Sequence, residues 1–205
     1  MTLIIVILTS AISIWAFSNE TVFTNLQLNP YQTFHRKEWY RLLTHGFLHA
    51  DWIHLIVNML VLFSFGTAVE QYFDQLEGGG YLKFPILWFI SLYVIGIIIS
   101  SVLSVAKHKD NPYYNSVGAS GAVSAIVFTS IFFAPIQKIL FYAVIPIPGI
   151  LFGVLYLIYS QYMSKKGSDN INHDAHFVGA VFGFIYPLFI DLSLINHFID
   201  QFQNL

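Results

Sequence analysis

Long apolar segments recur along this chain and leave room only for short polar stretches between them. Such segments occupy residues 3–17, 52–69, 82–105, 116–134, 139–162 and 175–190. A helix of about 20 apolar residues spans the hydrocarbon core of a bilayer. Only 10% of the residues are charged and 56% are hydrophobic, which is too apolar for an ordinary soluble domain. The sequence therefore predicts an all-α membrane protein, a multi-pass bundle of six transmembrane helices in a single domain over residues 1–205.

The first apolar segment, residues 3–17, has a second interpretation. Ala16-Phe17-Ser18 resembles the small-x-small site at which a signal peptide is cleaved. A signal peptide normally begins with Lys or Arg, and neither precedes this segment. We therefore interpret it as a retained first span, with a cleaved signal as the alternative.

Several classes of site are disfavoured by residue content. The chain has no cysteine, which removes disulfides, thiolate metal sites and cysteine nucleophiles. It has no basic patch of the kind that binds nucleic acid. His45 and His49 have the spacing of a zinc helix, but Gly46 stands where the metalloprotease pattern needs Glu. We expect no metal, no cofactor and no nucleic-acid partner.

The stretches between the spans differ in character. Residues 18–51 mix polar side chains with aromatic ones, so we expect a long amphipathic loop that rests partly in the membrane interface. A soluble connector is the alternative. Residues 71–80 end in three glycines and read as a flexible linker. Pro146 and Pro148 should kink or break the fifth span.

Polar residues stand near the start of three apolar segments. His54 and Asn58 share one helical face at the start of the second. Ser120 opens the fourth segment and His176 the sixth. If all six segments cross, these side chains lie roughly 5 to 10 Å below the same membrane face at 1.5 Å per residue. Because polar groups at that depth are costly and usually line a cavity or meet a partner, the shared depth predicts one water-reachable site.

The residue types at this depth suit acyl transfer. A serine hydroxyl is a weak nucleophile that needs a base, and the neutral imidazole of His176 suits that role near pH 7. The oxyanion of a tetrahedral intermediate needs donors. The ring N–H of His54, the amide of Asn58 and the backbone N–H of Ser120 can supply them.

Small residues can bring the two catalytic helices together. Gly179 and Gly183 lie on the face that carries His176, and Gly121 with Ala125 forms a matching strip beside Ser120. Gly118 flanks the serine on its other side. Taken alone, a serine between glycines is more often a helix-packing device than a nucleophile.

Four motifs in this order resemble those of the rhomboid intramembrane serine proteases. They are Trp39-Tyr40-Arg41, His49 to Asn58 as HxxxxHxxxN, Gly118-Ala119-Ser120-Gly121 as GxSG, and Ala175-His176 through Gly179 to Gly183 as AHxxGxxxG. The resemblance implies a Ser120–His176 dyad without a third carboxylate in a six-helix bundle of the cell membrane. It also implies that the partners are the lipid bilayer and transmembrane protein substrates, which are cut near their membrane-entry point. Many family members carry an aromatic residue four positions after the serine, where this chain has Ser124.

A non-proteolytic multi-pass membrane protein, either a transporter or a rhomboid-like binding protein, is the alternative function. Intramembrane His and Asn can line a substrate path in such a protein. Orientation also has two interpretations. The loops on the side away from the site, which follow the second and fourth spans, carry only Lys83 and Lys138. The other Lys and Arg residues lie in the loops on the side of the site, so the positive-inside rule places the site on the cytoplasmic face. The resemblance implies a cytoplasmic N-terminus and a site that opens outward, which we favour.

Overall fold

The computed structural model describes residues 1–141, 144–167 and 171–203. Within these residues the fold is mostly helical, with one small hairpin. The long helices are α1 (Thr2–Phe17), α5 (Trp52–Gly78), α6 (Pro85–His108), α7 (Ser120–Phe133), α8 (Gly149–Lys166) and α9 (His173–Ile185). The short ones are α2 (Glu20–Leu26), α3 (Pro30–His35), α4 (Arg41–Thr44), the 3-10 turn η1 (His45–Phe47), α10 (Pro187–Ile190) and α11 (Leu194–Gln203).

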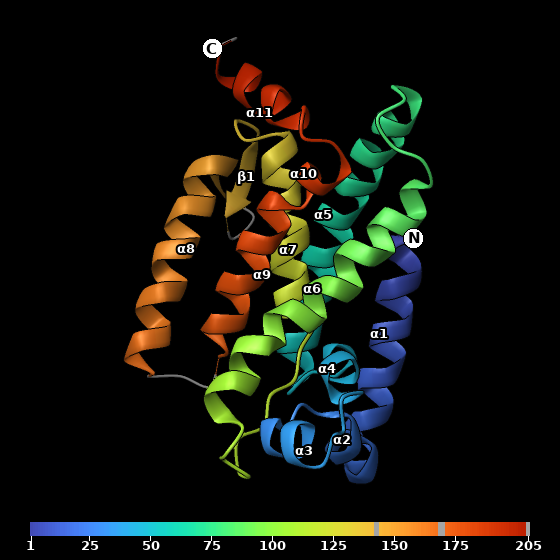
Figure 1. The fold of residues 1–205 in the computed structure, drawn as a ribbon, viewed down its shortest axis with the longest axis vertical. Coiled ribbons are helices and arrows are strands. Elements are labelled where there is room, and N and C mark those ends of the chain that lie inside the picture. The colour runs from blue at the N-terminus through green and yellow to red at the C-terminus, as the bar shows by residue number, and fades with distance from the viewer. Residues whose placement is uncertain (142–143, 168–170, 204–205) are drawn as a thin grey trace.

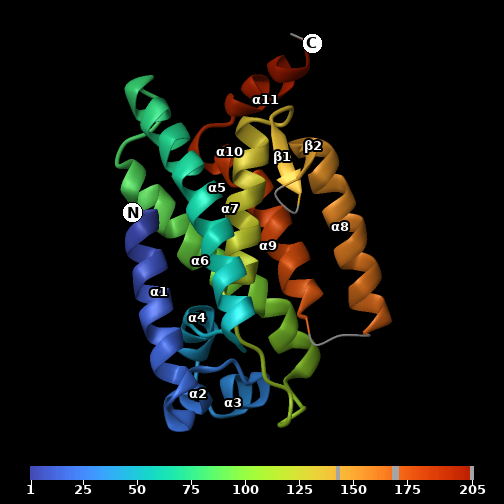
Figure 2. The same cartoon turned by 180° about the vertical axis from the view of Figure 1, so that it is seen from behind.

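Helix α7 is the centre of the bundle. Every residue from Gly121 to Phe133 is buried, and α5, α6 and α9 pack around it. The short helices α2, α3 and α4 gather at one end, while α11 and the hairpin lie at the other (Figures 1 and 2). Helix α8 lies at the edge of the bundle in both views. Ser120 begins α7 at its end nearer the short helices.

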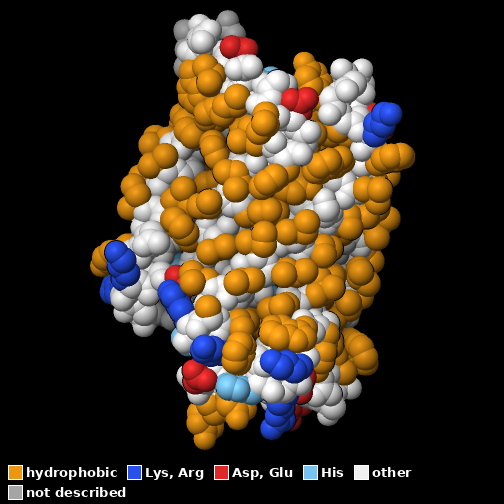
Figure 3. All heavy atoms as spheres, in the orientation of Figure 1, with side chains coloured by type: hydrophobic (Ala, Val, Ile, Leu, Met, Phe, Trp, Pro, Cys, Tyr) orange, Lys and Arg blue, Asp and Glu red, His pale blue; other side chains and the backbone are white. Residues whose placement is uncertain are grey.

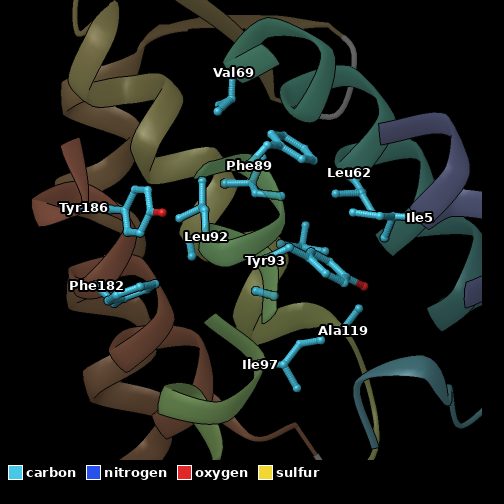
Figure 4. Close-up of a cluster of buried hydrophobic side chains, with 14 of the residues drawn as sticks. Ile5, Leu62, Val69, Phe89, Leu92, Tyr93, Ile97, Ala119, Phe182 and Tyr186 are labelled. Atoms are coloured by element: carbon cyan, nitrogen blue, oxygen red, sulfur yellow. The ribbon is translucent and has the colours of Figure 1, made fainter. Parts of the chain in front are cut away.

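The core lies where α5, α6 and α7 meet. Phe89, Leu92, Tyr93 and Ile97 of α6 are almost completely buried, and Leu62 of α5 packs into the same cluster (Figure 4). Many large apolar side chains face outward instead. On the face shown in Figure 3 they form a broad hydrophobic surface, with charged side chains toward the two ends. This distribution suits a protein whose sides contact lipid rather than water.

Within the described residues, α5 and α6 are long and apolar enough to cross a membrane, judged by length and composition. Helices α1 and α7 are also apolar but shorter, with 16 and 14 residues. Six spans stay a prediction, and α5 and α6 are the two described helices that meet this criterion.

The linker expected over residues 71–80 is wrong. Helix α5 continues to Gly78, and only Gly79 and Gly80 leave it, Gly80 with a φ of +79°. The extension is stabilised because Phe73 is completely buried against the bundle. The glycines lie where the helix ends, and burial of Phe73 explains why the helix extends that far.

The expected fifth span also differs. Strand β1 (Lys138–Phe141) pairs antiparallel with β2 (Ile145–Pro148), so the fold is not purely α-helical. Helix α8 starts only at Gly149. A proline has no N–H to donate and clashes with the preceding helical turn, so the helix begins after Pro148. Residues 142–143 of the expected span lie outside the described part.

The last span and the first loop are subdivided. The segment expected at 175–190 begins earlier, at His173, and Pro187 separates α9 from α10. The first loop contains α2, α3, α4 and η1, organised around buried Arg41. Its Nε donates to Glu38 at 2.6 Å, and its Nη1 donates to the carbonyls of Thr24 and Gln27 at 2.9 and 2.8 Å. The stretch between the fifth and sixth expected spans includes residues 168–170, which lie outside the described part.

Candidate active site

Ser120 and His176 meet at one end of the bundle. Ser120 is the first residue of α7, and His176 lies in the first turn of α9. The Ser120 hydroxyl oxygen is 2.7 Å from Nε2 of His176. This is the hydrogen-bond geometry that a nucleophile and its general base require.

The distance between the two side chains depends on two glycines of α9. A Cβ added at Gly179 would lie 2.1 Å from the carbonyl oxygen of Gly121, and one at Gly183 would lie 2.0 Å from that of Ala125. No side chain fits there, so the backbones of α7 and α9 touch. Thr129 adds a hydrogen bond to the Gly183 carbonyl at 2.7 Å. The small strips noted in the sequence therefore face each other.

The start of α9 is fixed from two sides. Asn172 caps the helix, because its side-chain oxygen accepts a hydrogen bond from the Ala175 N–H at 3.1 Å. Its amide nitrogen donates to the hydroxyl of Ser104 on α6 at 2.8 Å. The turn that carries His176 is thus tied to α6 as well as to α7.

The segment before Ser120 is held by the first loop. Leu28 and Ser116 form an antiparallel bridge with N···O distances of 3.0 and 2.9 Å. The Gly118 N–H donates to the His45 carbonyl at 3.0 Å, and the Asn29 amide donates to Asn115 at 2.9 Å. Sequence reasoning missed Leu28 and Asn29, because backbone pairing over such a separation leaves no periodic pattern.

His54 lies beside the serine. A Cβ added at Gly118 would lie 2.9 Å from Cε1 and 3.1 Å from Nε2 of the His54 ring. Gly118 has a φ of +128°, which also favours glycine. The Ala50 N–H donates to His54 Nδ1 at 3.3 Å, so the neutral ring carries its proton on Nε2. A donor from α5 therefore faces the loop that leads to Ser120.

Asn58 lies one turn deeper on the same face of α5. It is 7% exposed, and its amide nitrogen donates to the His54 carbonyl at 2.9 Å. An amide has two N–H bonds, so one is left for another acceptor. Among the described residues, no hydrogen bond joins Asn58 to Ser120 or His176.

The part of the chain that carries these residues matches a known family. The family model for the Rhomboid domain matches residues 36–191, which include Ser120, His176, His54 and Asn58. This match extends over most of the chain.

The chain belongs to the rhomboid family.

Three rhomboid relatives show how far the likeness extends. The chain is 26% identical over 181 residues to RHOMBOID-like protein 12, mitochondrial, of Arabidopsis thaliana, covering 81% of this chain and 51% of the relative. It is 31% identical over 147 residues to Rhomboid protease GluP of Bacillus subtilis (strain 168), covering 72% and 25%. It is 30% identical over 160 residues to Rhomboid-like protein 11, chloroplastic, of Arabidopsis thaliana, covering 72% and 51%. The chain spans about half or less of the length of these relatives.

His45 and His49, which have the spacing of a zinc helix, lie inside this rhomboid fold. His45 is 5% exposed and His49 fully buried, and His49 Nδ1 lies 2.9 Å from the Ser13 hydroxyl of α1. Desolvation lowers the pKa of His45 to about 4 and, with a contribution from the nearby His54 charge, lowers that of His49 to about 3. Both are therefore neutral packing residues near pH 7. The part of the chain that the structure describes contains no cluster of three metal-ligating side chains.

Proposed function

We propose that this chain is an intramembrane serine endopeptidase that hydrolyses peptide bonds in or near the transmembrane helices of its substrates. The observation that carries the proposal is the 2.7 Å hydrogen bond between Ser120 and His176. It lies among apolar helices of a rhomboid domain, with a histidine donor beside it. The relative from Bacillus subtilis is named a rhomboid protease, which agrees with this function.

In the proposed reaction, His176 Nε2 takes the hydroxyl proton of Ser120 while the oxygen attacks the substrate carbonyl. The oxyanion that forms is stabilised by donors, namely His54 Nε2–H, the backbone N–H of Ser120 and the second N–H of Asn58. His176 then gives the proton to the leaving amine, and the C–N bond breaks. Water attacks the acyl-enzyme with His176 again as base, which frees the second product and restores Ser120.

The proposed setting is a six-helix bundle in the cell membrane with the site opening outward. The positive-inside rule points the other way, but it treats every Lys and Arg of a loop as free to set topology. Arg41 is 4% exposed and hydrogen-bonded inside the first loop, so it has a structural role. Cysteine labelling of variants at residues 108 and 138 tests this topology: the outward orientation requires external reagent to reach 108 only.

The experiment that tests the function combines a probe with a substrate. A fluorophosphonate should label the wild-type protein and leave Ser120→Ala unlabelled, because only the serine oxygen can attack the phosphorus. The wild-type protein in detergent should cut a model single-pass membrane protein, and His176→Ala should not. Equal labelling of wild type and Ser120→Ala would overturn the assignment and favour the transporter or binding-protein alternative.

A second measurement tests the oxyanion donors. His54→Ala should lower kcat by about 10²- to 10³-fold with little change in KM, because the donor acts mainly in the transition state. Asn58→Ala should act in the same direction and more weakly, since one of its N–H groups is already bound to His54. An unchanged kcat in both variants would show that His54 and Asn58 have a structural role only.

A further inference from the structure

The imidazole of His176 has an aromatic neighbour from another helix. Tyr156 of α8 lies nearly parallel to it, with ring centroids 6.4 Å apart and an interplanar angle of 19°. Offset parallel rings at this separation are within the favourable range for aromatic pairs. On helix α7, which carries Ser120, the residue one turn further on is the small Ser124 and not an aromatic residue.

Ser124 and Tyr156 form a matched pair. Their hydroxyl oxygens lie 2.7 Å apart, and Ser124 is 6% exposed. A phenol in an apolar bundle needs a hydrogen-bond partner, because a buried hydroxyl without one destabilises the fold. The small serine leaves space for the ring and satisfies its hydroxyl. An aromatic side chain at position 124 would compete for the same space.

Other rings and one glycine keep Tyr156 in place. Its ring lies 5.7 Å from that of Phe128 on α7 and 6.0 Å from that of Phe152 on α8. Gly153, one turn before Tyr156, lets α8 approach α7 closely, because a Cβ there would lie 3.3 Å from Phe128. The side chain is therefore packed on several sides before it meets His176.

We propose that Tyr156 is a positioning residue for His176, supplied by α8 and fixed by Ser124, and this inference rests on the proposed protease function. A ring beside the imidazole restricts its rotation, so Nε2 stays directed at the Ser120 oxygen. The 6.4 Å separation exceeds the roughly 6 Å reach of a strong cation–π contact, so orientation outweighs charge stabilisation. The geometry of the dyad is then correct only while α8 lies against α7 and α9.

Steady-state kinetics on a model membrane substrate test this role. Tyr156→Ala should lower kcat by about 10- to 100-fold with KM nearly unchanged, since small displacements of catalytic groups have effects of this size. Tyr156→Phe keeps the ring and should retain most of kcat. Tyr162→Ala removes a 60% exposed tyrosine of the same helix and is the matched control. A wild-type kcat in Tyr156→Ala, or an equal loss in Tyr162→Ala, would overturn the proposal.

A relocated ring gives a sharper test. In Tyr156→Ala combined with Ser124→Tyr, the aromatic side chain comes from α7 into the space that the first change opens. Recovery of kcat above that of Tyr156→Ala alone is expected, because the ring and not its helix orients the imidazole. If the double variant folds with a wild-type melting temperature and shows no recovery, Tyr156 does not act through its ring.

An activity-independent measurement separates this proposal from the protease assignment. In nitrogen-15 histidine NMR spectra, the His176 imidazole signals are assigned with His176→Gln. They should broaden or shift in Tyr156→Ala and stay in place in Tyr162→Ala. Unchanged signals in Tyr156→Ala would overturn the positioning role. A wild-type protein that fluorophosphonates do not label would instead overturn the protease function, and the spectra would still decide on Tyr156.

Discussion

Helices α9 and α8 both contact α7 beside the dyad, yet they do so in different ways. On α9, Gly179 and Gly183 bring backbone against backbone, with no room for a methyl group. On α8 only Gly149, Gly153 and Ser160 are buried, and the contact runs through side chains such as Tyr156 and Phe128. The first contact is rigid and the second is adjustable.

The difference separates two requirements of the site. In the proposed protease, Ser120 and His176 must stay within about 0.5 Å of their productive geometry. Contacts between backbones hold this distance because no flexible side chain lies between the two helices. Under the proposed role of Tyr156, a side-chain contact from α8 restricts the rotation of the imidazole. Substitutions on the two helices should therefore differ in size and kind.

Of the packing changes on these two helices, Gly183→Ala is expected to have the largest effect. The added methyl carbon would lie 2.0 Å from the Ala125 oxygen, so α9 must move away by roughly 1 Å, which can cost about 10²-fold in rate. Overpacking of this kind also lowers stability by about 1–3 kcal/mol. Cleavage assays and melting temperatures in detergent measure both.

Gly78→Ala is the control for Gly183→Ala, because a Cβ at Gly78 meets nothing within 4 Å. It should leave activity and melting temperature unchanged. A Gly183→Ala protein with wild-type activity and stability would show that α7 and α9 do not touch as closely as described.

Much of this rigid contact could be predicted from the sequence, and little of the adjustable one. Gly179 and Gly183 lie four residues apart on α9, as Gly121 and Ala125 do on α7, and each spacing is a local pattern. Tyr156 lies on α8 and His176 on α9, and no sequence pattern links the positions of these two residues. Its one sequence signal is negative, namely the small Ser124 where the resemblance leads one to expect an aromatic ring.

In the overall fold, too, features with a local sequence pattern were predictable and contacts between distant segments were not. Motif order predicts the rhomboid family, which is confirmed. Apolar length predicts an all-α chain, whereas the described residues are mostly helical with one hairpin. Pro146 and Pro148 predict a kink or break in the fifth span, but they do not predict the hairpin of β1 and β2 found there. The bridge between Leu28 and Ser116 forms because the first loop folds back toward the segment before Ser120. The local periodicity of the sequence does not predict such a contact.

A smaller effect is expected from acid, which acts on the first loop rather than on α8 or α9. The pKa values of His45 and His49 are lower in the folded chain than the usual 6.5, so the unfolded state binds more protons in mild acid. Stability should fall as pH drops from about 6.5 toward 4, and His45 alone accounts for about 3 kcal/mol at 1.36 kcal/mol per pKa unit.

Melting temperatures between pH 7.5 and 4.5 measure this effect. Since the His45 carbonyl holds Gly118, the segment before Ser120 should loosen together with the loop. His45→Asn should flatten the pH dependence, and His35→Gln, a change at an exposed histidine of the same loop, serves as the control. A pH dependence as steep in His45→Asn as in wild type would show that other groups cause the acid sensitivity.

The smallest effect is expected for Gly153→Ala, the same chemical change as Gly183→Ala on the other helix. The new methyl carbon would meet the edge of Phe128 at 3.3 Å and Ile131 at 3.5 Å, and both side chains can shift by a few tenths of an ångström. Replacing a helical glycine also gains up to about 1 kcal/mol in propensity, which offsets the tight contact. The melting temperature should therefore stay within about 4 °C of wild type.

Activity of Gly153→Ala should fall only slightly, through a small shift of Tyr156 one turn away. The informative quantity is the ratio of the two losses, measured on one substrate under one set of conditions. If Gly153→Ala loses as much activity as Gly183→Ala, α8 is held as rigidly as α9. The orientation of His176 would then depend on the backbone of α8 rather than on an adjustable ring.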